Sequence, residues 1–431
     1  MDISPPIIFG IIFVLFLLSS APIAVAMGLT SVIYFFLFTN MPLPQLADNL
    51  FNGLNKFPLM AVPFFVLAAN LMATGGISSR IVASANALVG HIKGGLGVTA
   101  ILSCMFFAAI SGSSPATVVA VGTLLIPEMI RAGYGKKFAT GIIATSGSLG
   151  ILIPPSIALI VYGIATETSV GALFLGGILP GLLGGVLIIV LVLVMTRFKS
   201  FGGLAEVTPM PRVPLKEKFK TIGGASLSLF LPVFVLGGIY GGFFTPTEAA
   251  GMAVFYALIV SVFIYKEIRV RDLVGVTLKS ARTSAMILFI IANAMIFSFV
   301  LAYERIPGQI TDQIIAMDLT AWQFLLILNI LLLVVGAFMD TISALVILAP
   351  IMLPIGMALD IHPVHLGIIM VMNLEIGLIT PPFGVNLFVA SGMSKVPPMQ
   401  VAQGAAPSAL VLLFALLLVT YVPFFALAFI G

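Results

Sequence analysis

The sequence predicts an all-α polytopic membrane protein made of two inverted-topology repeats. Three observations support this prediction: the composition, the recurrence of long apolar runs and a pair of matching helix breaks. Hydrophobic residues make up 61% of the 431-residue chain and charged residues 8%, whereas a soluble domain is about half apolar and a quarter charged. Apolar runs close to the roughly 20 residues needed to cross a bilayer recur along the whole length. They leave no segment for a sizeable soluble domain.

The matching breaks lie in two apolar segments from opposite halves of the chain. Residues 149–156 read LGILIPPS, and residues 376–383, which lie 227 positions later, read IGLITPPF. Pro127 and Pro354 are related by the same offset. Interruptions at corresponding positions of two halves point to the binding site of a secondary transporter built from internal repeats. The sequence therefore predicts a solute carrier.

The lysine and arginine residues predict the topology. The positive-inside rule places the three basic clusters, residues 131–137, 197–220 and 266–282, in the cytoplasm. Threading the spans between these clusters leaves only Lys56 and Arg305 outside, so 17 of the 19 basic residues lie inside. We therefore attribute the net charge of +4 to orientation among membrane lipids and not to a nucleic-acid partner.

The same threading requires two segments to enter and leave the membrane on one side. Residues 94–130 begin and end in the cytoplasm, and residues 321–357 begin and end outside. Each is predicted to be a re-entrant helical hairpin, and the two hairpins open to opposite faces, as an inverted repeat requires. A broken transmembrane helix follows each hairpin, at residues 138–166 and 366–395.

The tip of the first hairpin, residues 111–117, reads SGSSPAT. Ser and Gly are weak helix formers, and Pro115 suits the first turn of a new helix, so the backbone is expected to open here. Open backbone survives in the membrane only inside protein or along a cavity. Carbonyls of one half-helix and the hydroxyls of Ser111 and Ser114 could bind a small hard cation, while the next half-helix presents amides to an anion. The Pro154-Pro155 pair would free further carbonyls on the facing wall.

The second half carries different polar residues at the corresponding places. Asp340 lies in the tip GAFMDTIS, residues 336–343. A carboxylate inside the membrane costs about 2.5–3.5 kcal/mol on insertion scales and is usually functional. Asp340 is equally suited to cap the N-terminus of the return helix, and both roles stay open. Glu375, in the second broken span, either couples to an ion or makes a structural hydrogen bond.

Four motifs together resemble the large membrane subunit of the tripartite ATP-independent periplasmic (TRAP) transporters: SGSSPATVVAVG, GSLGILIPPS, DTISALVILAPIMLPI and GLITPPFGVNLFVASG. The resemblance covers essentially the whole chain. It implies an elevator-type transporter of the bacterial inner membrane that imports an organic acid, such as sialic acid or a C4-dicarboxylate, together with sodium ions. It also implies two partners, a small four-helix membrane subunit and a soluble periplasmic solute-binding protein.

The resemblance further implies three sets of ligand residues. The first sodium site would use hydroxyls and carbonyls of the first tip and the first break: Ser111, Ser114, Gly150, Ile153 and Pro155. The second would use the corresponding residues of the second half: Gly336, Gly377, Thr380 and Phe383. The substrate would lie between the hairpin tips, near Ser113, Pro115, Asp340 and Asn386.

An elevator divides the chain into a scaffold and a transport domain. We expect the transport domain to hold the hairpins and broken helices, residues 94–166 and 321–395. The scaffold would hold the helices of the first repeat (1–93), a helix with the inter-repeat linker (167–222), the helices of the second repeat (223–320) and the C-terminal helix (396–431).

Two rival functions stay open. A stand-alone sodium/dicarboxylate symporter of similar hairpin design would need no binding protein. An intramembrane enzyme could use Asp340 and Glu375 as an acid and base pair. The internal repeat argues against the enzyme, because catalysis gives no reason for two oppositely oriented copies.

Overall fold

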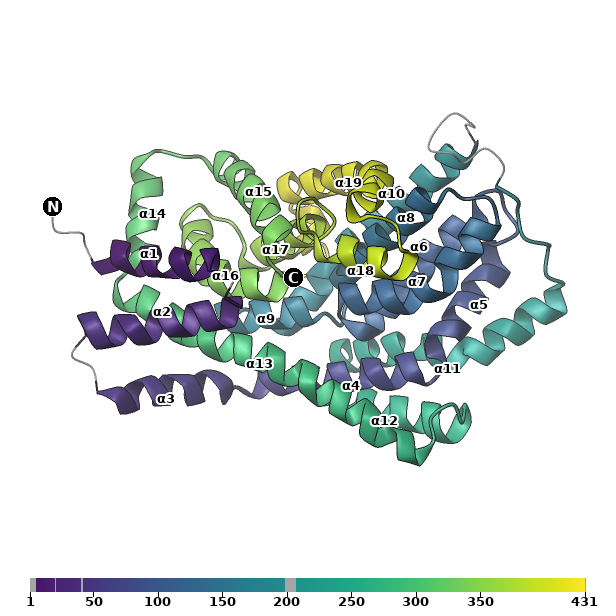
Figure 1. The fold of residues 1–431 in the computed structure, drawn as a ribbon, viewed down its shortest axis with the longest axis horizontal. Helices are drawn as coiled ribbons and strands as arrows, with labels where there is room; N and C mark the ends of the chain where they lie inside the picture. The colour runs from purple at the N-terminus through teal and green to yellow at the C-terminus, as the bar shows by residue number, and fades with distance from the viewer. Residues whose placement is uncertain (1–4, 20, 40–41, 198–206, 431) are drawn as a thin grey trace.

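The computed structural model describes residues 5–19, 21–39, 42–197 and 207–430. Every regular element in these ranges is a helix, and eight helices are long and apolar enough to cross a membrane. Counting one pair bent by 43° as a single span gives nine. The chain is therefore an all-α polytopic membrane protein, as the composition predicts (Figure 1).

An outer layer, called here the framework group, contains α1–α5 and α11–α13. The 31-residue α13 is about 46 Å long at 1.5 Å per residue, more than the roughly 30 Å of a hydrocarbon core. It runs along the lower side of the molecule and packs against α2, α3 and α4, while α12 packs on α4 (Figure 1). The bounds are α1 Pro5–Leu18, α2 Ile23–Phe38, α3 Leu43–Leu54, α4 Ala61–Thr74, α5 Ile77–Val89, α11 Leu215–Tyr240, α12 Pro246–Leu258 and α13 Leu273–Tyr303.

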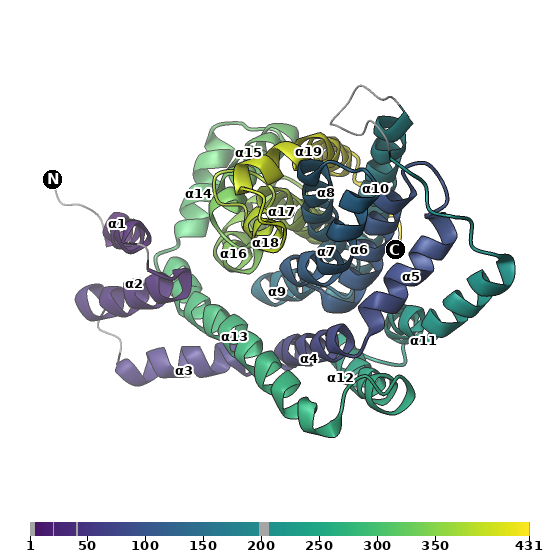
Figure 2. The same cartoon turned by 45° about the vertical axis from the view of Figure 1, so that its right-hand side comes forward.

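The inner layer, called here the hairpin group, contains the four helices that follow α5 and the four that follow α14. These helices cluster together above the band formed by α13, α4 and α12 (Figure 2). The bounds in the first half are α6 Gly95–Ser111, α7 Ser114–Arg131, α8 Lys136–Leu149 and α9 Ile157–Thr166. Those in the second half are α15 Ala321–Phe338, α16 Thr341–Ala358, α17 Pro363–Gly377 and α18 Val385–Ser394.

The helix breaks occur where the sequence predicts them. Gly112 has φ +58°, a left-handed conformation that favours glycine, and it ends α6 just before α7 begins at Ser114. The first Pro-Pro break separates α8 from α9, and Ser156 caps α9 by accepting a hydrogen bond from the Leu159 amide at 3.3 Å. Both Pro-Pro peptide bonds are cis.

The third proline pair does not behave as an interruption. Pro127 lies inside α7 and Pro354 lies inside α16, and both helices continue through them. The matching offset therefore marks four helix breaks, two at the tips and two at the Pro-Pro pairs.

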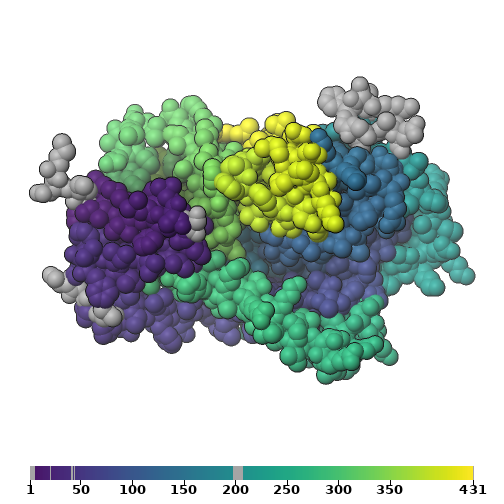
Figure 3. All heavy atoms as spheres, in the orientation of Figure 1, coloured from purple at the N-terminus to yellow at the C-terminus, as the bar shows by residue number. Residues whose placement is uncertain are grey.

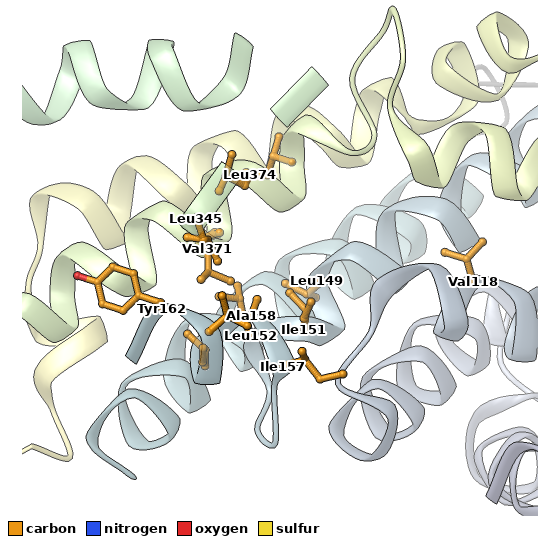
Figure 4. Close-up of a cluster of buried hydrophobic side chains, with 14 of the residues drawn as sticks. Val118, Leu149, Ile151, Leu152, Ile157, Ala158, Tyr162, Leu345, Val371 and Leu374 are labelled. Atoms are coloured by element: carbon orange, nitrogen blue, oxygen red, sulfur yellow. The ribbon is translucent and has the colours of Figure 1, made fainter. Parts of the chain in front are cut away.

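The two halves of the chain interlock inside the hairpin group. Helix α18 packs on α7 and α8, and α16 packs on α9. Side chains from both halves share one core, in which Leu152 and Ala158 lie beside Val371 and Leu345 (Figure 4). The Tyr162 hydroxyl donates to a second-half backbone carbonyl at 2.8 Å. The repeats are thus joined through their own helices and not only by the linker.

Three further helices join these layers, with bounds α10 Val170–Arg197, α14 Ile306–Ala316 and α19 Pro398–Tyr421, and the short α20 spans Phe424–Leu427. Helices α10 and α19 pack on each other and against the hairpin group. Gly141 of α8 faces the backbone of Gly404 and Ala405 in α19 so closely that a side chain would not fit. Such small-residue contacts are how helices associate in lipid, where apolar burial does not drive helix association. The last part of the chain, drawn in yellow, lies between the green helices of the second half and the blue helices of the first (Figure 3).

Loops assigned to one side of the membrane contact each other. The Thr208 amide donates to the Ala132 carbonyl and the Met210 amide to the Gly90 carbonyl, each at 3.1 Å. These contacts tie the described part of the predicted linker to two loops that the basic residues place in the cytoplasm. Residues 198–206 of that linker lie outside the described residues.

Candidate functional site between the hairpin tips

The first tip is held by its own hydroxyl groups. The hydroxyls of Ser111 and Thr117 lie 3.0 Å apart, and that of Thr117 donates to the Ser113 carbonyl at 2.8 Å. Ser111 and Ser114 are almost completely buried, whereas Ser113 and Pro115 are half-buried. At this tip the two serines predicted for sodium are therefore buried, whereas the two residues predicted for the substrate are more accessible.

The first tip meets the first break. The Ile157 amide donates to the Gly112 carbonyl at 3.3 Å, and a Cβ added to Gly112 would lie 3.2 Å from the Pro155 carbonyl oxygen. Within the break, the Gly150 carbonyl accepts from the Ile153 amide at 3.0 Å. Carbonyl oxygens predicted for one cation site are therefore beside the serine-rich tip.

The second tip meets the second break in the same way. The Phe383 amide donates to the Ala337 carbonyl at 3.2 Å, and the Gly377 carbonyl accepts from the Thr380 amide at 2.9 Å. A Cβ added to Gly377 would lie 2.5 Å from the Gly336 backbone, so the two helices touch through glycine.

The two junctions are related by the repeat but differ in exposure. Gly150 and Ile153 correspond to Gly377 and Thr380 at the offset of 227. The Pro-Pro pair of the first half is buried, whereas that of the second half is exposed and the side chain of the following residue, Phe383, is 57% exposed. The first junction is therefore buried within the protein, whereas the second lies at its surface.

Asp340 caps a helix. Its carboxylate accepts hydrogen bonds from the amide and the hydroxyl of Ser343, at 3.0 and 2.5 Å, at the start of α16. The N-cap role left open by the sequence is confirmed. At the start of α7 the Ser113 side chain makes no capping hydrogen bond, and the Ser113 amide donates to the Ser111 hydroxyl at 3.4 Å, so no carboxylate balances the positive end of this helix.

Asn386 joins the two halves at the centre of the hairpin group. Its side-chain nitrogen donates to the Ser114 hydroxyl at 3.2 Å and to the Ser148 hydroxyl at 2.6 Å, and all three residues are fully buried. The side-chain oxygen of Asn386 has no hydrogen-bond partner. The predicted substrate residue Asn386 is thus brought against a predicted sodium residue and away from the accessible surface.

Glu375 lies in the same region, 2% exposed. Thr341 donates to its Oε1 at 2.8 Å, and its Oε2 has no partner. Neither Glu375 nor Asp340 takes part in an ion pair with another described residue.

Ser148 and Thr341 were not predicted as site residues, although the sequence contains a signal that identifies them. Ser114 and Thr341 are related by the offset of 227, and so are Ser148 and Glu375. The structure places Ser114 and Ser148 against Asn386 and joins Thr341 to Glu375, and all five residues are buried. Applying the repeat offset to every polar residue of the breaks would have found both.

Two interlocked helical halves, four mid-helix breaks and a buried polar cluster between the tips define a multi-pass membrane permease for a solute. Comparison with known proteins identifies the kind of permease. The chain matches the family model described as tripartite ATP-independent periplasmic transporter, DctM component, over residues 9–425. The chain belongs to this family and is a large permease component of a TRAP transporter, a multi-pass protein of the bacterial inner membrane and not an enzyme.

Individual relatives agree with this family. The chain is 47% identical over 403 residues to the C4-dicarboxylate TRAP transporter large permease protein DctM of Pseudomonas aeruginosa, covering 94% of this chain and 93% of that protein. It is 41% identical over 426 residues to the isethionate TRAP transporter permease protein DctMQ of Oleidesulfovibrio alaskensis, covering 99% of this chain and 66% of that protein. Among solved structures, the Alcanivorax borkumensis YdaH transporter has a TM-score of 0.63 at 16% identity, covering 97% and 98% of the two chains. YdaH therefore shares the fold.

Proposed function

We propose that this permease imports a C4-dicarboxylate across the inner membrane together with sodium ions. The substrate class is inferred from the relative named for C4-dicarboxylates, which is 47% identical over nearly the whole chain. The sodium coupling is inferred from the observation that carries the proposal: two repeat-related junctions where a hairpin tip meets the backbone of a broken helix. Family membership favours this tripartite transporter over the stand-alone symporter.

The two junctions provide the oxygen atoms for the proposed sodium sites. The first proposed sodium site would use Ser111 and Ser114 together with carbonyl oxygens of the first break. The second would use Gly336 together with Gly377, Thr380 and Phe383. A carbonyl oxygen that accepts one hydrogen bond keeps a second lone pair for a cation. Hard cations prefer such oxygen ligands, and the C-terminal end of each half-helix adds negative potential.

The start of α7 is the proposed binding place for a substrate carboxylate. The N-terminal end of a helix attracts anions through its positive dipole and unpaired amides. Ser113 and Pro115 lie at this end, which has no side-chain cap, and both are half-buried. Because Asp340 occupies the equivalent end of α16, the anion site is placed mainly at the first tip, with Asp340 and Asn386 shaping the opposite wall.

The inverted repeats and the elevator movement belong to the same proposal. The breaks, the interlocked halves and the separate framework layer favour a hairpin group that moves against α1–α5 and α11–α13. The packing of α10 and α19 supports counting these two helices with the moving part, although the sequence assigned residues 167–222 and 396–431 to the scaffold. Moving the substrate with sodium ions avoids carrying a bare charge through lipid.

Two partners complete the proposed transporter: a small membrane subunit and a periplasmic solute-binding protein. The family is a component of a tripartite system. The DctMQ relative extends well beyond the segment that this chain covers, which agrees with a second membrane subunit being fused to the large one there. We place the small subunit against the framework group, whose lipid-facing helices carry many exposed apolar side chains.

Uptake by reconstituted proteoliposomes tests the proposed function. The permease and its small subunit are reconstituted, the binding protein is added outside, and uptake of radiolabelled succinate is followed with and without an inward sodium gradient. We expect uptake that requires both the gradient and the binding protein. Sialic acid and isethionate serve as competitors that distinguish the substrate classes.

Three results would contradict parts of the proposal separately. Uptake at the same rate in potassium would refute sodium coupling. Uptake at the same rate without the binding protein would support the stand-alone symporter. Competition by sialic acid, but not by dicarboxylates, would refute the substrate class and leave the mechanism untouched.

A further inference from the structure

A cavity of about 580 Å³ lies where the framework group meets the hairpin group. Its volume falls within the range of about 300–1,000 Å³ that is usual for ligand pockets. The framework lines it with residues from segments 56–61 and 245–247, and the facing wall comes from segment 160–171, at the end of α9 and the start of α10. Its described lining includes none of the residues of the two tip junctions. The cavity is therefore separate from the proposed sodium and substrate sites.

The ends of several membrane spans meet at this cavity. The candidate spans Phe57–Thr74, Val170–Arg197 and Pro246–Ile264 all begin with a residue that lines it, and the bent span of α8 and α9 ends next to Glu167, which also lines it. The distribution of basic residues predicts that these ends lie outside. The cavity is therefore expected at the headgroup boundary of the periplasmic leaflet, where phospholipid is the most abundant neighbour.

The lining of the cavity is amphipathic. Its apolar side chains come from the spans and include Phe57, Ala61, Ile160, Ile164 and Val170. Its polar side chains lie at the ends of the spans and include Lys56, Glu167, Thr168, Ser169, Thr245 and Thr247. Water gains no hydrogen-bond partners along an apolar wall, whereas an acyl chain is already present in the bilayer. A ligand with an apolar chain and a polar head therefore matches this lining.

The polar end of the cavity carries one charge of each sign. Lys56 Nζ lies 3.5 Å from Glu167 Oε1, and the two side chains are 36% and 85% exposed. A long, exposed ion pair of this kind contributes little stability, so a ligand that meets both charges can replace it. A phosphoethanolamine headgroup has a negative phosphate for Lys56 and a positive ammonium group for Glu167. A purely anionic headgroup would be attracted by Lys56 but repelled by Glu167.

We propose that this cavity binds a zwitterionic phospholipid with an ethanolamine headgroup from the periplasmic leaflet. The phosphate contacts Lys56, the ammonium group contacts Glu167, and one acyl chain occupies the apolar part of the cavity. Because both groups of helices line the cavity, the lipid lies across the boundary between them. This inference depends neither on the proposed substrate nor on sodium coupling, since it follows from the cavity and its charges alone.

Photolabelling of the intact complex tests this site. The full chain with its small membrane subunit is placed in phosphatidylcholine vesicles that contain a phosphatidylethanolamine or a phosphatidylglycerol with a diazirine in one acyl chain. After illumination, mass spectrometry measures the labelling of segments 56–61 and 160–171. We expect about fivefold more labelling there by the ethanolamine lipid at equal mole fraction, the effect of about one charge at a membrane surface. The exposed apolar face of α11 should be labelled equally by both lipids.

Glu167→Gln removes the group that attracts the ammonium and repels an anionic headgroup. We expect the preference for the ethanolamine lipid to fall about fivefold, so that both lipids label the cavity to a similar extent. Asp312→Asn removes one negative charge from an exposed position of α14 and should leave the preference unchanged. A preference that survives Glu167→Gln would overturn the proposed headgroup contact.

Gly171→Leu tests the place of the acyl chain without changing a charge. Gly171 lines the cavity, and a Cβ added there meets only the Ser169 hydroxyl, at 3.8 Å, so a leucine can occupy the cavity without displacing the backbone. We expect labelling of segments 56–61 and 160–171 to be lost with both lipids. Gly10→Leu, on α1 with no atom within 4 Å of the added carbon, should be labelled like the unsubstituted protein.

Four results would overturn the proposal. Two concern the unsubstituted complex: equal labelling of the cavity by both lipids, or stronger labelling by phosphatidylglycerol. The third is full labelling of Gly171→Leu. The fourth is a cavity that neither lipid labels in the complex but both label in the permease alone, which would show that the small subunit covers it.

Discussion

Ser148 and Asn386 are hydrogen-bonded at 2.6 Å although 238 residues separate them in the chain. One lies in the first broken span and the other in the second, so this contact joins the two repeats where both helices are interrupted. A buried pair of this kind holds the relative position of the halves.

Asn386→Leu should weaken both stability and coupling. Leucine is the residue at the repeat-related position 159, so the size is acceptable, but the hydroxyls of Ser114 and Ser148 lose their partner. Interhelical hydrogen bonds in membranes contribute about 0.6 kcal/mol each and at most about 1.7. We expect a reduction of about 1–2 kcal/mol in the free energy of unfolding, measured in detergent, together with a higher sodium requirement for uptake. Unchanged values for both would contradict a joining role.

Ser114→Ala and Thr380→Val should each raise the sodium concentration needed for half-maximal uptake. Each change removes one hydroxyl from a proposed sodium site, and losing about 1.4 kcal/mol of binding corresponds to about tenfold. Uptake in proteoliposomes over a range of sodium concentrations measures the effect. Thr123→Val is the matched control, because Thr123 lies exposed on α7 and bonds only its own helix and Met393. Normal sodium dependence in both site variants would refute the assignment.

Gly377→Ala should disturb the second junction. The added methyl group would lie 2.5 Å from the Gly336 backbone, so α15 and α17 must separate. Overpacking of this kind costs about 1–3 kcal/mol, and the tip would move from its break. We expect a lower thermal midpoint and a loss of uptake, whereas Gly237→Ala, in α11 with no atom within 4 Å of the added carbon, should leave both unchanged. Wild-type behaviour of Gly377→Ala would show that the close approach is not required.

Asp340→Ala and Asp340→Asn should differ in stability. Alanine removes the N-cap of α16, which costs about 1 kcal/mol, whereas asparagine is an equally good cap. Thermal unfolding should therefore show a drop for alanine and little change for asparagine. Uptake by the asparagine variant then reports on charge alone. A large drop in stability for asparagine as well would mean that the negative charge, and not capping, is what the tip needs.

Cross-linking positions 56 and 167 should stop transport. Lys56, at the start of the framework segment before α4, pairs with Glu167, between α9 and α10, at 3.5 Å. A cavity of about 580 Å³ lies beside this pair. The native chain has one cysteine, Cys104, which is buried, so a double variant Lys56→Cys and Glu167→Cys can be joined by a short bifunctional maleimide. If the hairpin group moves past the framework, uptake should be lost only in the cross-linked double variant. Full uptake after complete cross-linking would contradict that movement.

The sequence by itself determined the helical class, the breaks and the family. Hydropathy and proline positions act locally, because a break needs only the residues that cannot continue a helix. The tips at Gly112 and Asp340 and the Pro-Pro pairs were therefore placed correctly, as was the relation of Gly150 to Gly377. Pro127 and Pro354 were placed in error among the interruptions, since neighbouring helices and local adjustment can accommodate a proline in a membrane helix.

Only the tertiary structure decided which polar groups meet. No local rule brings Asn386 to Ser148, because that contact depends on how the two halves interlock. Nor does one bring Thr341 to Glu375, because that contact depends on how α16 packs against α17. The choice between capping and ion binding for Asp340 also needed the coordinates of Ser343. Sequence patterns report what a segment can form, whereas the partner of a buried polar atom is selected by packing between helices, which for Asn386 and Ser148 are 238 residues apart.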